Sequence, residues 1–453
     1  MNPSDKQKSV SSPLSIIPRD EVTSYDVRPS FEVRQRKKVE TRIKRVAQRC
    51  LRVVIGIVGF ATRTPRRGPE LRAGSAEVQR ILVVRVDLLG DVVLSLPAVR
   101  ALRRAYPSAR IDMLVLGSSA GILAGETDLD HVLSFDPYIW RSPLALGNPK
   151  TWRNIRTFLS TLRAARYDLA ISVSGDIGSI LTRLSGARRR VGYGGEAYKF
   201  MLTDVLPGGR YRKRQHETQY VLALAQAAGG VVVPGDEHLH LNVVPLASAH
   251  VMELLRQGRA RLSVEGPVIA IHAGARNGQA KRWPHTYFSA LIDLLVRDLD
   301  ALVVLTGAPG EAPLAHAVES GAREHVLNLV GKTNLPELVA LIAASDLLIT
   351  GDSGPMHIAC AVKTPVVALH GPTDPALSGP TASDAVVLRR DLWCSPCYDA
   401  SATAECRFGN PVCMKGIAPA MVFAAARRQL RRNGWELPAQ ARDDVHAISA
   451  PHS

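Results

Sequence analysis

The sequence predicts an α/β protein with two doubly wound domains in series. Apolar runs of strand length alternate with helical patterns from residue 80 onwards, which is typical of parallel sheets covered by helices on both faces. The length of 453 residues and the hydrophobic content of 46% suffice for two ordinary domains with sizeable cores. Residues 345–372 combine a strand, a tight turn, a helix and a second strand in the stretch SDLLITGDSGPMHIACAVKTPVVALHGP.

The first 79 residues form a basic extension of different composition. Residues 1–80 contain 18 Lys and Arg against 8 Asp and Glu, so they supply +10 of the net charge of +16. Residues 1–35 are polar and predict disorder, whereas 36–62 place Val39, Ile43, Val46 and Cys50 at helical spacing among many basic residues. This pattern fits an amphipathic helix on an anionic membrane, a helix packed on the protein itself, or a disordered basic arm.

The composition also excludes some classes of protein. No nucleic-acid-binding module accompanies the positive charge, so an anionic membrane or an anionic substrate is the expected partner. No apolar run reaches the length of about 18 residues that a spanning helix needs, and the polar start MNPSDKQKSVSSP does not resemble a secretory signal. We therefore expect a cytoplasmic protein.

The first domain is expected over residues 80–245. It opens with the strand ILVVRV from Ile81, followed by a turn and a helix over 92–106. Further helices are expected over 151–166 and 217–228, and further strands over 111–116, 131–135, 169–173 and 190–192.

The second domain is expected over residues 246–434, after a connecting segment at 231–264. Helices are expected to begin near Pro284, Glu311, Leu335 and Ser353, and residues 435–453 predict a disordered tail. The strands are expected over 268–272, 301–306, 326–329, 346–350 and 365–369. In such sheets, ligands bind beyond the carboxyl ends of the strands, and we expect the two domains to face a shared cleft there.

Four turns at strand ends carry residues suited to chemistry. After the first strand, Gly90 and Asp91 open a helix, where Asp91 is either a helix cap or a catalytic carboxylate. Three turns of the second domain offer charged groups, glycines and a fresh helix N-terminus, which suit a nucleotide diphosphate. Their alternatives are a solvated basic loop and ordinary helix caps. Their candidate residues are Gly274, Arg276 and Lys281, then Glu311, and finally Asp352, Ser353, Gly354, Pro355 and His357.

The chain resembles glycosyltransferase family 9, the bacterial ADP-heptose heptosyltransferases. The resemblance covers about residues 80–432 and rests on RVDLLGDVVLSLPAVRALRRAYP at 85–107, HAGARNGQAKRWPHTYFSALI at 272–292, LTGAPGE at 305–311 and the stretch 329–375. It implies a GT-B fold with two Rossmann-like domains, and transfer of a heptose from an ADP-sugar to a lipopolysaccharide core acceptor with inversion. The 1–79 extension lies outside the family pattern.

The resemblance also implies roles for residues. Asp91 matches the general base, and Lys281 with the amides of Ser353–Met356 would hold the diphosphate. Asp352 would contact the sugar, and His357 the phosphates or the sugar. Glu311 would hold the ribose, unless Pro309 occupies the matching place. Some family members carry a Thr pair where this chain has Ala275 and Arg276. The resemblance therefore supports a nucleotide-sugar donor more strongly than it supports one particular sugar.

Two further clusters lie outside these turns. Basic residues near His216 predict an acidic acceptor site in the first domain, with a solvated charge run as the alternative. These residues are Arg188, Arg189, Arg190, Arg212 and Arg214. The cysteines Cys394, Cys397, Cys406 and Cys413 could bind zinc or iron, although their spacing matches no standard finger.

We therefore expect an inverting heptosyltransferase that needs no cofactor for catalysis and lies peripherally on the inner membrane. A family relative that uses another nucleotide sugar or a protein acceptor is the alternative, and the cysteine cluster would favour the protein acceptor. A non-catalytic, membrane-tethered protein that binds sugar nucleotides is the rival from a different class.

Overall fold

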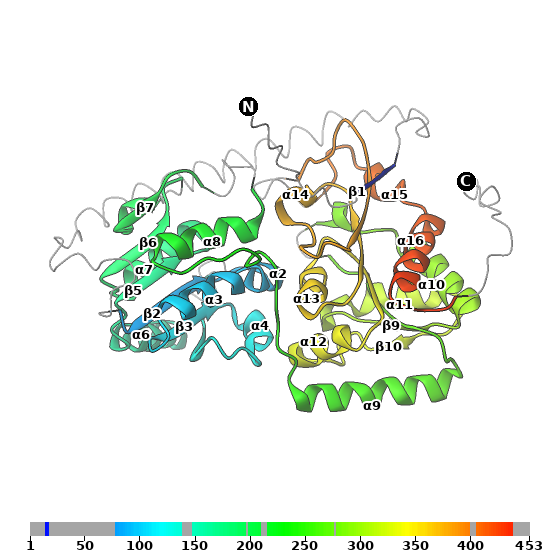
Figure 1. The fold of residues 1–453 in the computed structure, drawn as a ribbon, viewed down its shortest axis with the longest axis horizontal. Helices are drawn as coiled ribbons and strands as arrows, with labels where there is room; N and C mark the ends of the chain where they lie inside the picture. The colour runs from blue at the N-terminus through cyan, green and yellow to red at the C-terminus, as the bar shows by residue number, and fades with distance from the viewer. Residues whose placement is uncertain are drawn as a thin grey trace, which may run out of the picture. The chain divides into compact units, whose positions relative to one another are not determined.

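The computed structural model describes residues 14–17, 78–137, 147–195, 198–209, 215–275, 278–398 and 405–437. The chain divides into two compact units, with the boundary between Val244 and Pro245 (Figure 1). The N-terminal unit contains the described residues from Val78 to Val244. The C-terminal unit contains those from Pro245 to Leu437 together with a strand at Leu14–Ile17. The predicted amphipathic segment 36–62 and the tail from residue 438 lie outside the described residues.

The N-terminal unit is built on a six-stranded parallel sheet. Its strand order is β4-β3-β2-β5-β6-β7, so the first predicted strand lies at the centre. The residues of β2, β3 and β5 are almost all buried, which is why these strands read as continuous apolar runs. The strands are β2 (Arg80–Arg85), β3 (Arg110–Val115), β4 (His131–Ser134), β5 (Leu169–Ser172), β6 (Arg189–Tyr193) and β7 (Asp204–Leu206).

Helices cover both faces of this sheet. Helices α3 and α8 pack on each other, while α7 packs on β2, β5 and β6 and contacts α6. The helix expected over 92–106 is wrong in one respect, because the chain forms two helices separated at Leu94 and Ser95. The helices are α2 (Leu89–Val93), α3 (Leu96–Ala105), α4 (Gly117–Ala120), α6 (Pro149–Ala164), α7 (Gly175–Leu184) and α8 (Glu217–Ala227), with short 3-10 turns at Gly121–Leu123 and Lys199–Met201.

The C-terminal unit is built on a seven-stranded parallel sheet in the order β1-β13-β12-β11-β8-β9-β10. Strands β8, β11 and β12 are buried along their whole length and form the centre of the sheet. The strands are β1 (Leu14–Ile17), β8 (Val268–His272), β9 (Leu302–Leu305), β10 (Leu327–Asn328), β11 (Leu347–Gly351), β12 (Val366–His370) and β13 (Val386–Arg390).

Two groups of helices flank this second sheet (Figure 1). Helix α10 packs on α11 and α16, and α12 packs on α9 and α13. The helices are α9 (Pro245–Leu262), α10 (His285–Leu299), α11 (Ala312–Gly321), α12 (Leu335–Ala343), α13 (Gly354–Val362), α14 (Pro375–Ser378), α15 (Val412–Lys415) and α16 (Pro419–Arg432), with 3-10 turns at Gln279–Lys281 and Pro309–Glu311.

Three parts of the C-terminal unit differ from the expectation. Leu14–Ile17 forms β1 and pairs in parallel with Val387–Arg390, although residues 1–35 were expected to be disordered. Helix α9 occupies 18 residues of a segment expected only to connect two domains. Trp435 and Leu437 pack against the core, so the chain is still ordered where a disordered tail was expected to start. Among the described residues, no helix is long and apolar enough to cross a membrane.

Candidate active site

The predicted donor residues of the C-terminal unit follow three neighbouring strands. In the sheet, β9, β8 and β11 lie side by side and all run in parallel. Their carboxyl ends therefore meet at one edge, where parallel α/β sheets bind ligands. The turns after these strands bring Gly274, Lys281, Glu311 and Asp352 to this edge.

Lys281 and Asp352 form the charged centre of this edge. The Lys281 Nζ lies 2.9 Å from Asp352 Oδ2, and both side chains are almost buried, at 13% and 10% exposure. Burial opposes ionisation of Asp352, but His370, Lys281 and His357 outweigh it and lower the pKa of the carboxyl. The Asp352 carboxyl therefore favours its ionised form in a site largely shielded from water, next to the Lys281 side chain.

Two residues beside this pair were missed by the sequence reasoning. The ring of Tyr398 lies under Lys281, with Nζ 4.2 Å from the ring centroid, which is a cation–π contact. His370, the last residue of β12, is fully buried, and its burial lowers its pKa while Asp352 opposes this shift. Tyr398 reaches the site because the amides of Cys397 and Tyr398 both donate to the Pro372 carbonyl. Proximity in the fold creates these contacts, so the spacing of the sequence gives no signal for them.

The position of Lys281 follows from a buried anchor next to it. Trp283 is buried and packs edge-on against Tyr287 and Phe288 of α10. Its Nε1–H donates to the Ile417 carbonyl at 2.8 Å, which satisfies the one polar group of the indole. The chain two residues after Lys281 is thereby fixed to the core.

The N-terminus of α13 lies directly after Asp352. The Ser353 hydroxyl does not cap the helix and lies 2.8 Å from the Thr350 hydroxyl instead. Pro355 has no N–H group, and the Met356 N–H donates to the Ser353 carbonyl at 3.2 Å. Of the amides expected to bind an anion, those of Ser353 and Gly354 thus remain as candidates. His357 is buried in the first turn of this helix.

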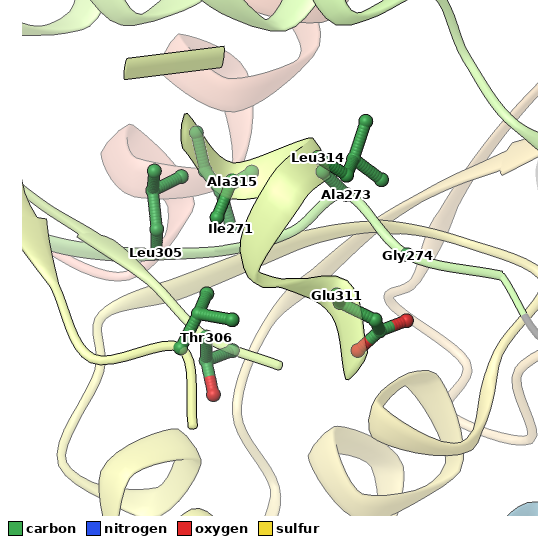
Figure 2. Close-up of a pocket in the computed structure, with 9 residues that line it drawn as sticks. Ile271, Ala273, Gly274, Leu305, Thr306, Glu311, Leu314 and Ala315 are labelled. Carbon is green, nitrogen blue, oxygen red and sulfur yellow. The ribbon is translucent and has the colours of Figure 1, made fainter. Parts of the chain in front are cut away.

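A pocket opens beside this charged centre between the ends of β8 and β9 (Figure 2). Its polar groups are the carboxylate of Glu311 and the hydroxyl of Thr306. Glu311 Oε2 accepts the Ala308 N–H at 2.8 Å, and Gly274 and Gly307 leave the space that the carboxylate occupies. The other lining residues are apolar: Ile271, Ala273, Gly274, Leu305, Leu314, Ala315 and Val330.

Thr306 carries a buried polar atom that the protein does not satisfy. The residue is only 3% exposed, and its Oγ1 makes no hydrogen bond within the described residues. A buried hydroxyl without a partner costs about 1–3 kcal/mol, so a water molecule or a ligand group that paired with Thr306 would stabilise the site.

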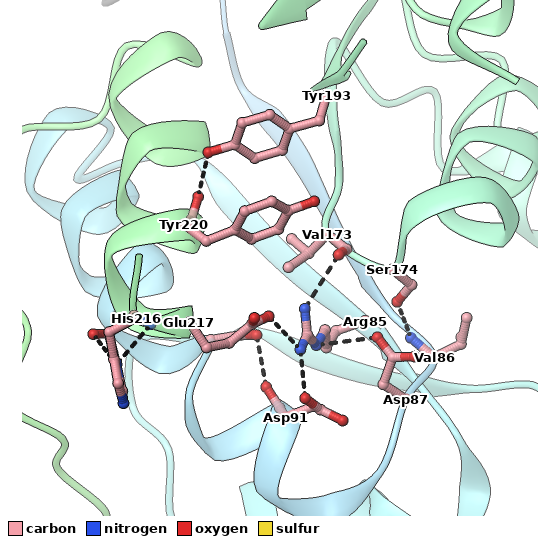
Figure 3. Close-up of polar contacts among 12 residues, drawn as sticks. Arg85, Val86, Asp87, Asp91, Val173, Ser174, Tyr193, His216, Glu217 and Tyr220 are labelled. Atoms are coloured by element: carbon pink, nitrogen blue, oxygen red, sulfur yellow. Dashed lines mark hydrogen bonds and ion pairs between the residues drawn. The ribbon is translucent and has the colours of Figure 1, made fainter. Parts of the chain in front are cut away.

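Asp91 is not a helix cap, contrary to one of the two expectations for it. Helix α2 begins at Leu89, which places Asp91 inside the first turn, and its side chain reaches the guanidinium of Arg85 (Figure 3). Arg85 Nη2 lies 2.9 Å from Asp91 Oδ1 and 2.8 Å from Glu217 Oε1. Asp91 keeps 21% side-chain exposure at the carboxyl edge of the N-terminal sheet, as a catalytic carboxylate requires.

The predicted acceptor residues are not gathered in one site. Arg189 and Arg190 lie at the start of β6, opposite the edge where Asp91 lies, and structural partners engage both. Arg189 binds Asp204 and the Ala227 and Ala228 carbonyls at the end of α8. Arg190 donates to Ala187 and Met201, and burial lowers its pKa to about 10. These two arginines stabilise the fold, which corrects their assignment to the acceptor.

The other acceptor candidates have separate outcomes. Arg188 is exposed, and Arg212, Arg214 and the donor candidate Arg276 lie outside the described residues. His216 is the N-cap of α8, where its Nδ1 accepts the Thr218 N–H at 3.3 Å. It immediately precedes Glu217 and so lies beside the cluster around Asp91 (Figure 3).

The four late cysteines do not form a metal site in the described residues. Burial, with Cys397, Cys394 and Cys406 nearby, raises the pKa of Cys413 to about 12, so the thiols share one neighbourhood. However, no group of three or more His, Cys, Asp or Glu side chains in the described part of the chain is arranged to hold a metal ion. Cys413 is buried in α15 whereas the other three lie on partly exposed loops, and Cys406 Sγ donates to the Asn410 carbonyl. The zinc or iron site suggested by the sequence is therefore not supported.

Two Rossmann-like units, one with a largely buried Lys–Asp pair at a helix N-terminus and one with a partly exposed carboxylate in the helix after its first strand, have the architecture of a GT-B glycosyltransferase. The model of glycosyltransferase family 9 (heptosyltransferase) matches residues 155–407. The match covers more than half of the chain. The chain therefore belongs to this family and is a lipopolysaccharide heptosyltransferase-type glycosyltransferase.

Individual relatives agree with this assignment. Lipopolysaccharide heptosyltransferase 2 of Escherichia coli is 31% identical over 317 residues, which cover 68% of this chain and 88% of the relative. Lipooligosaccharide heptosyltransferase 2 of Haemophilus influenzae is 29% identical over 319 residues, with the same coverage of 68% and 88%. The solved structure of E. coli ADP-heptose LPS heptosyltransferase II has a TM-score of 0.61 and 24% identity and covers 78% of this chain and 99% of its own.

Proposed function

We propose that this protein transfers a heptose from ADP-heptose to an acidic lipopolysaccharide core acceptor, with inversion at the anomeric carbon. The acceptor hydroxyl gives its proton to the Asp91 carboxylate while its oxygen attacks the anomeric carbon. The bond between that carbon and the diphosphate oxygen breaks, and ADP leaves with the electron pair. The observation that carries the proposal is the buried Lys281–Asp352 pair at the N-terminus of α13.

The donor half of the proposal is supported by how the polar groups are distributed. Lys281 and the amides of Ser353 and Gly354 offer positive charge for the diphosphate, which gains charge as ADP leaves. Asp352 is left to accept a hydroxyl of the sugar. Glu311 and Thr306 line the pocket beyond β8 and β9, where the partly exposed Glu311 carboxylate offers an acceptor for ribose hydroxyls. One structural neighbour is named for ADP-heptose, which agrees with this donor.

The proposal predicts turnover that depends on one donor and a defined acceptor. The purified protein should release ADP from ADP-heptose only when a truncated lipopolysaccharide core acceptor is present, and the product should be the opposite anomer by NMR. Turnover should persist in a chelator, because Lys281 and α13 supply the charge that a cofactor would otherwise provide. ADP binding without turnover on any core acceptor would favour a non-catalytic binding protein, and no ADP binding would refute the donor assignment.

Thr306→Val should have opposite effects on stability and on binding. Valine has nearly the same shape but no hydroxyl, so it removes the unpaired buried group. We expect the free energy of unfolding of the ligand-free protein to rise by about 1 kcal/mol and ADP binding to weaken by about tenfold. Chemical denaturation and calorimetry measure the two quantities, and Thr306→Ser, which keeps the hydroxyl, is the control. A variant that binds ADP as tightly as the wild type would show that Thr306 does not contact the nucleotide.

We further propose that the enzyme works in the cytoplasm, peripherally at the inner membrane, through the basic segment 36–62. Eight basic residues precede the apolar patch at Val53–Ala61, and six of them are Lys37, Lys38, Arg42, Lys44, Arg45 and Arg49. Replacing these six by glutamine should move the protein from the membrane to the soluble fraction, since each basic residue contributes about 1 kcal/mol of attraction to an anionic surface. This change leaves β1 intact, which deletion of residues 1–79 would not. An unchanged membrane fraction would refute the role of this segment.

A further inference from the structure

Arg85 is a buried cation shared by three carboxylates. It is the last residue of β2 and has no exposed surface. Its Nη2 contacts both Asp91 Oδ1 and Glu217 Oε1, its Nε lies 3.3 Å from Asp87 Oδ2, and its Nη1 donates to the Val173 carbonyl at 3.1 Å (Figure 3). The guanidinium is thus fixed in orientation by contacts from four places in the sequence.

The three carboxylates differ in their access to solvent. The side chains of Asp91 and Asp87 are 21% and 24% exposed, whereas that of Glu217 is only 3% exposed. A substrate can therefore reach Asp91 but not Glu217. Burying a carboxylate costs free energy unless it is paired. Glu217 is buried and pairs with an arginine 132 residues away in the sequence, so this pair is part of the folded core and not a surface ion pair.

Simple electrostatics gives Glu217 a role towards Asp91. A cation in contact with a carboxylate favours its ionised form and makes it a poorer proton acceptor, while a nearby negative charge does the opposite. Because Asp91 and Glu217 share one guanidinium nitrogen, Glu217 takes up part of the charge that Asp91 would otherwise receive alone. A second carboxylate beside Asp91 also makes its proton uptake more favourable.

We propose that Arg85 and Glu217 are positioning residues that fix the orientation and set the base strength of Asp91. This inference rests on the proposed role of Asp91 as the general base. Arg85 holds one carboxylate oxygen of Asp91 in place, and Glu217 offsets the loss of base strength that this contact causes. Other titratable groups near the ends of these elements that face Arg85 are Asp87, His216 at the start of α8 and Asp176 in the first turn of α7, whereas Arg80 and Arg183 lie at the far ends of β2 and α7.

Glu217→Gln tests this role through the pH dependence of the reaction. The base acts only when ionised, so kcat/KM falls as pH falls through its titration. The variant removes one of the three carboxylates that share Arg85 and leaves Asp91 as the only anionic partner of Nη2, so we expect the acid limb of the profile to move about one pH unit lower and the plateau rate to fall about threefold. A profile that coincides with that of the wild type would refute the role of Glu217.

The double variant Arg85→Gln/Glu217→Gln gives the opposite sign. It removes one positive and one negative charge, so it preserves the charge balance of the buried cluster and remains informative if the single variant does not fold. Asp91 loses its contacting cation, and the acid limb should move to higher pH than in the wild type. If Arg85 and Glu217 only stabilised the fold, the acid limb would stay in place in the single and the double variant, and the activity of both variants would fall. That result would overturn the proposal.

The matched control and a substrate-free readout separate the possible failures. Asp236→Asn also neutralises a buried carboxylate paired with an arginine, Arg104, in the same unit, and should leave the acid limb in place. Carbon-13 NMR of aspartate-labelled protein, with the Asp91 signal assigned by its loss in Asp91→Asn, should show the same two opposite shifts of the Asp91 titration. Unchanged titrations would refute this inference, whereas shifted titrations with an active Asp91→Asn enzyme would refute only the base assignment.

Discussion

Replacing Asp91 by asparagine is expected to lower kcat by about a thousandfold, within the range of general base catalysis. The amide keeps the shape of the side chain and can still accept from Arg85, so the cluster around it should survive. It cannot take up the proton of the acceptor hydroxyl, and the rate loss should therefore appear in kcat. The affinity for ADP should stay within about twofold, because Asp91 belongs to the N-terminal unit and the donor groups belong to the other.

Asp87→Asn is the comparison for this prediction. Asp87 is slightly more exposed than Asp91 and lies against the same guanidinium, at 3.3 Å from Nε. Its loss alters the charge around Arg85 but removes no proton acceptor from the reaction, so we expect kcat to fall by less than about tenfold. Initial rates at saturating donor and acceptor measure both variants. Equal losses in the two, or an Asp91→Asn enzyme within tenfold of the wild type, would contradict the assignment of the base.

Lys281→Met should weaken ADP binding by about a hundredfold and lower kcat/KM for the donor further, by about a thousandfold. The variant keeps the length and apolar stem of the side chain but removes the cation from the site. Asp352 then remains in a buried position without the Lys281 ammonium that helps to lower the pKa of its carboxyl. A diphosphate would approach an uncompensated carboxylate, and the charge that develops on leaving ADP would lose its counter-ion.

Two further variants show whether charge is the cause. Lys281→Arg keeps the cation and should retain ADP binding within about tenfold, although its planar head changes the contact with Tyr398. The double variant Lys281→Met/Asp352→Asn removes the unpaired carboxylate and should recover part of the lost ADP affinity, which calorimetry would measure. If the double variant bound ADP no better than Lys281→Met, repulsion by Asp352 would not be the reason for the loss.

The fold was predictable from sequence because most of its strands are buried on both faces. The strand predicted at Val268 matches β8 at both ends. The strands predicted to start at Ala301, Asp346 and Pro365 differ from β9, β11 and β12 by one residue at each end. Strands β1, β7 and β13 and several helices were missed, and two of the missed elements, β13 and α9, show mixed patterns. β13 ends in two arginines, and α9 exposes Leu246 and Met252 while carrying basic residues in its last turn. Neither segment shows the apolar periodicity on which the prediction depended.

The candidate site was predictable where one turn contained the whole signal. The sequence GDSGPMH places Asp352, the helix N-terminus and His357 within seven residues, and the structure keeps them together. Arg85 escaped notice because a basic residue at the end of an apolar run reads as the first residue of a loop. Its meaning depends on Glu217, which only the packing of α8 beside β2 reveals. Arg189 and Arg190 failed for the converse reason, since a basic run does not show which arginines are engaged by backbone carbonyls.

Strand β1 has a consequence for the order in which the molecule is made. Its partner β13 comes from residues 386–390, so the C-terminal unit consists of two pieces of chain with the N-terminal unit inserted between them. During synthesis, Leu14–Ile17 emerges before the whole N-terminal unit and cannot pair until residues 386–390 have been made. The N-terminal unit can meanwhile complete its own sheet, because β2 to β7 are contiguous in the chain. Among the described strands, the earliest in the chain is thus among the last to be paired.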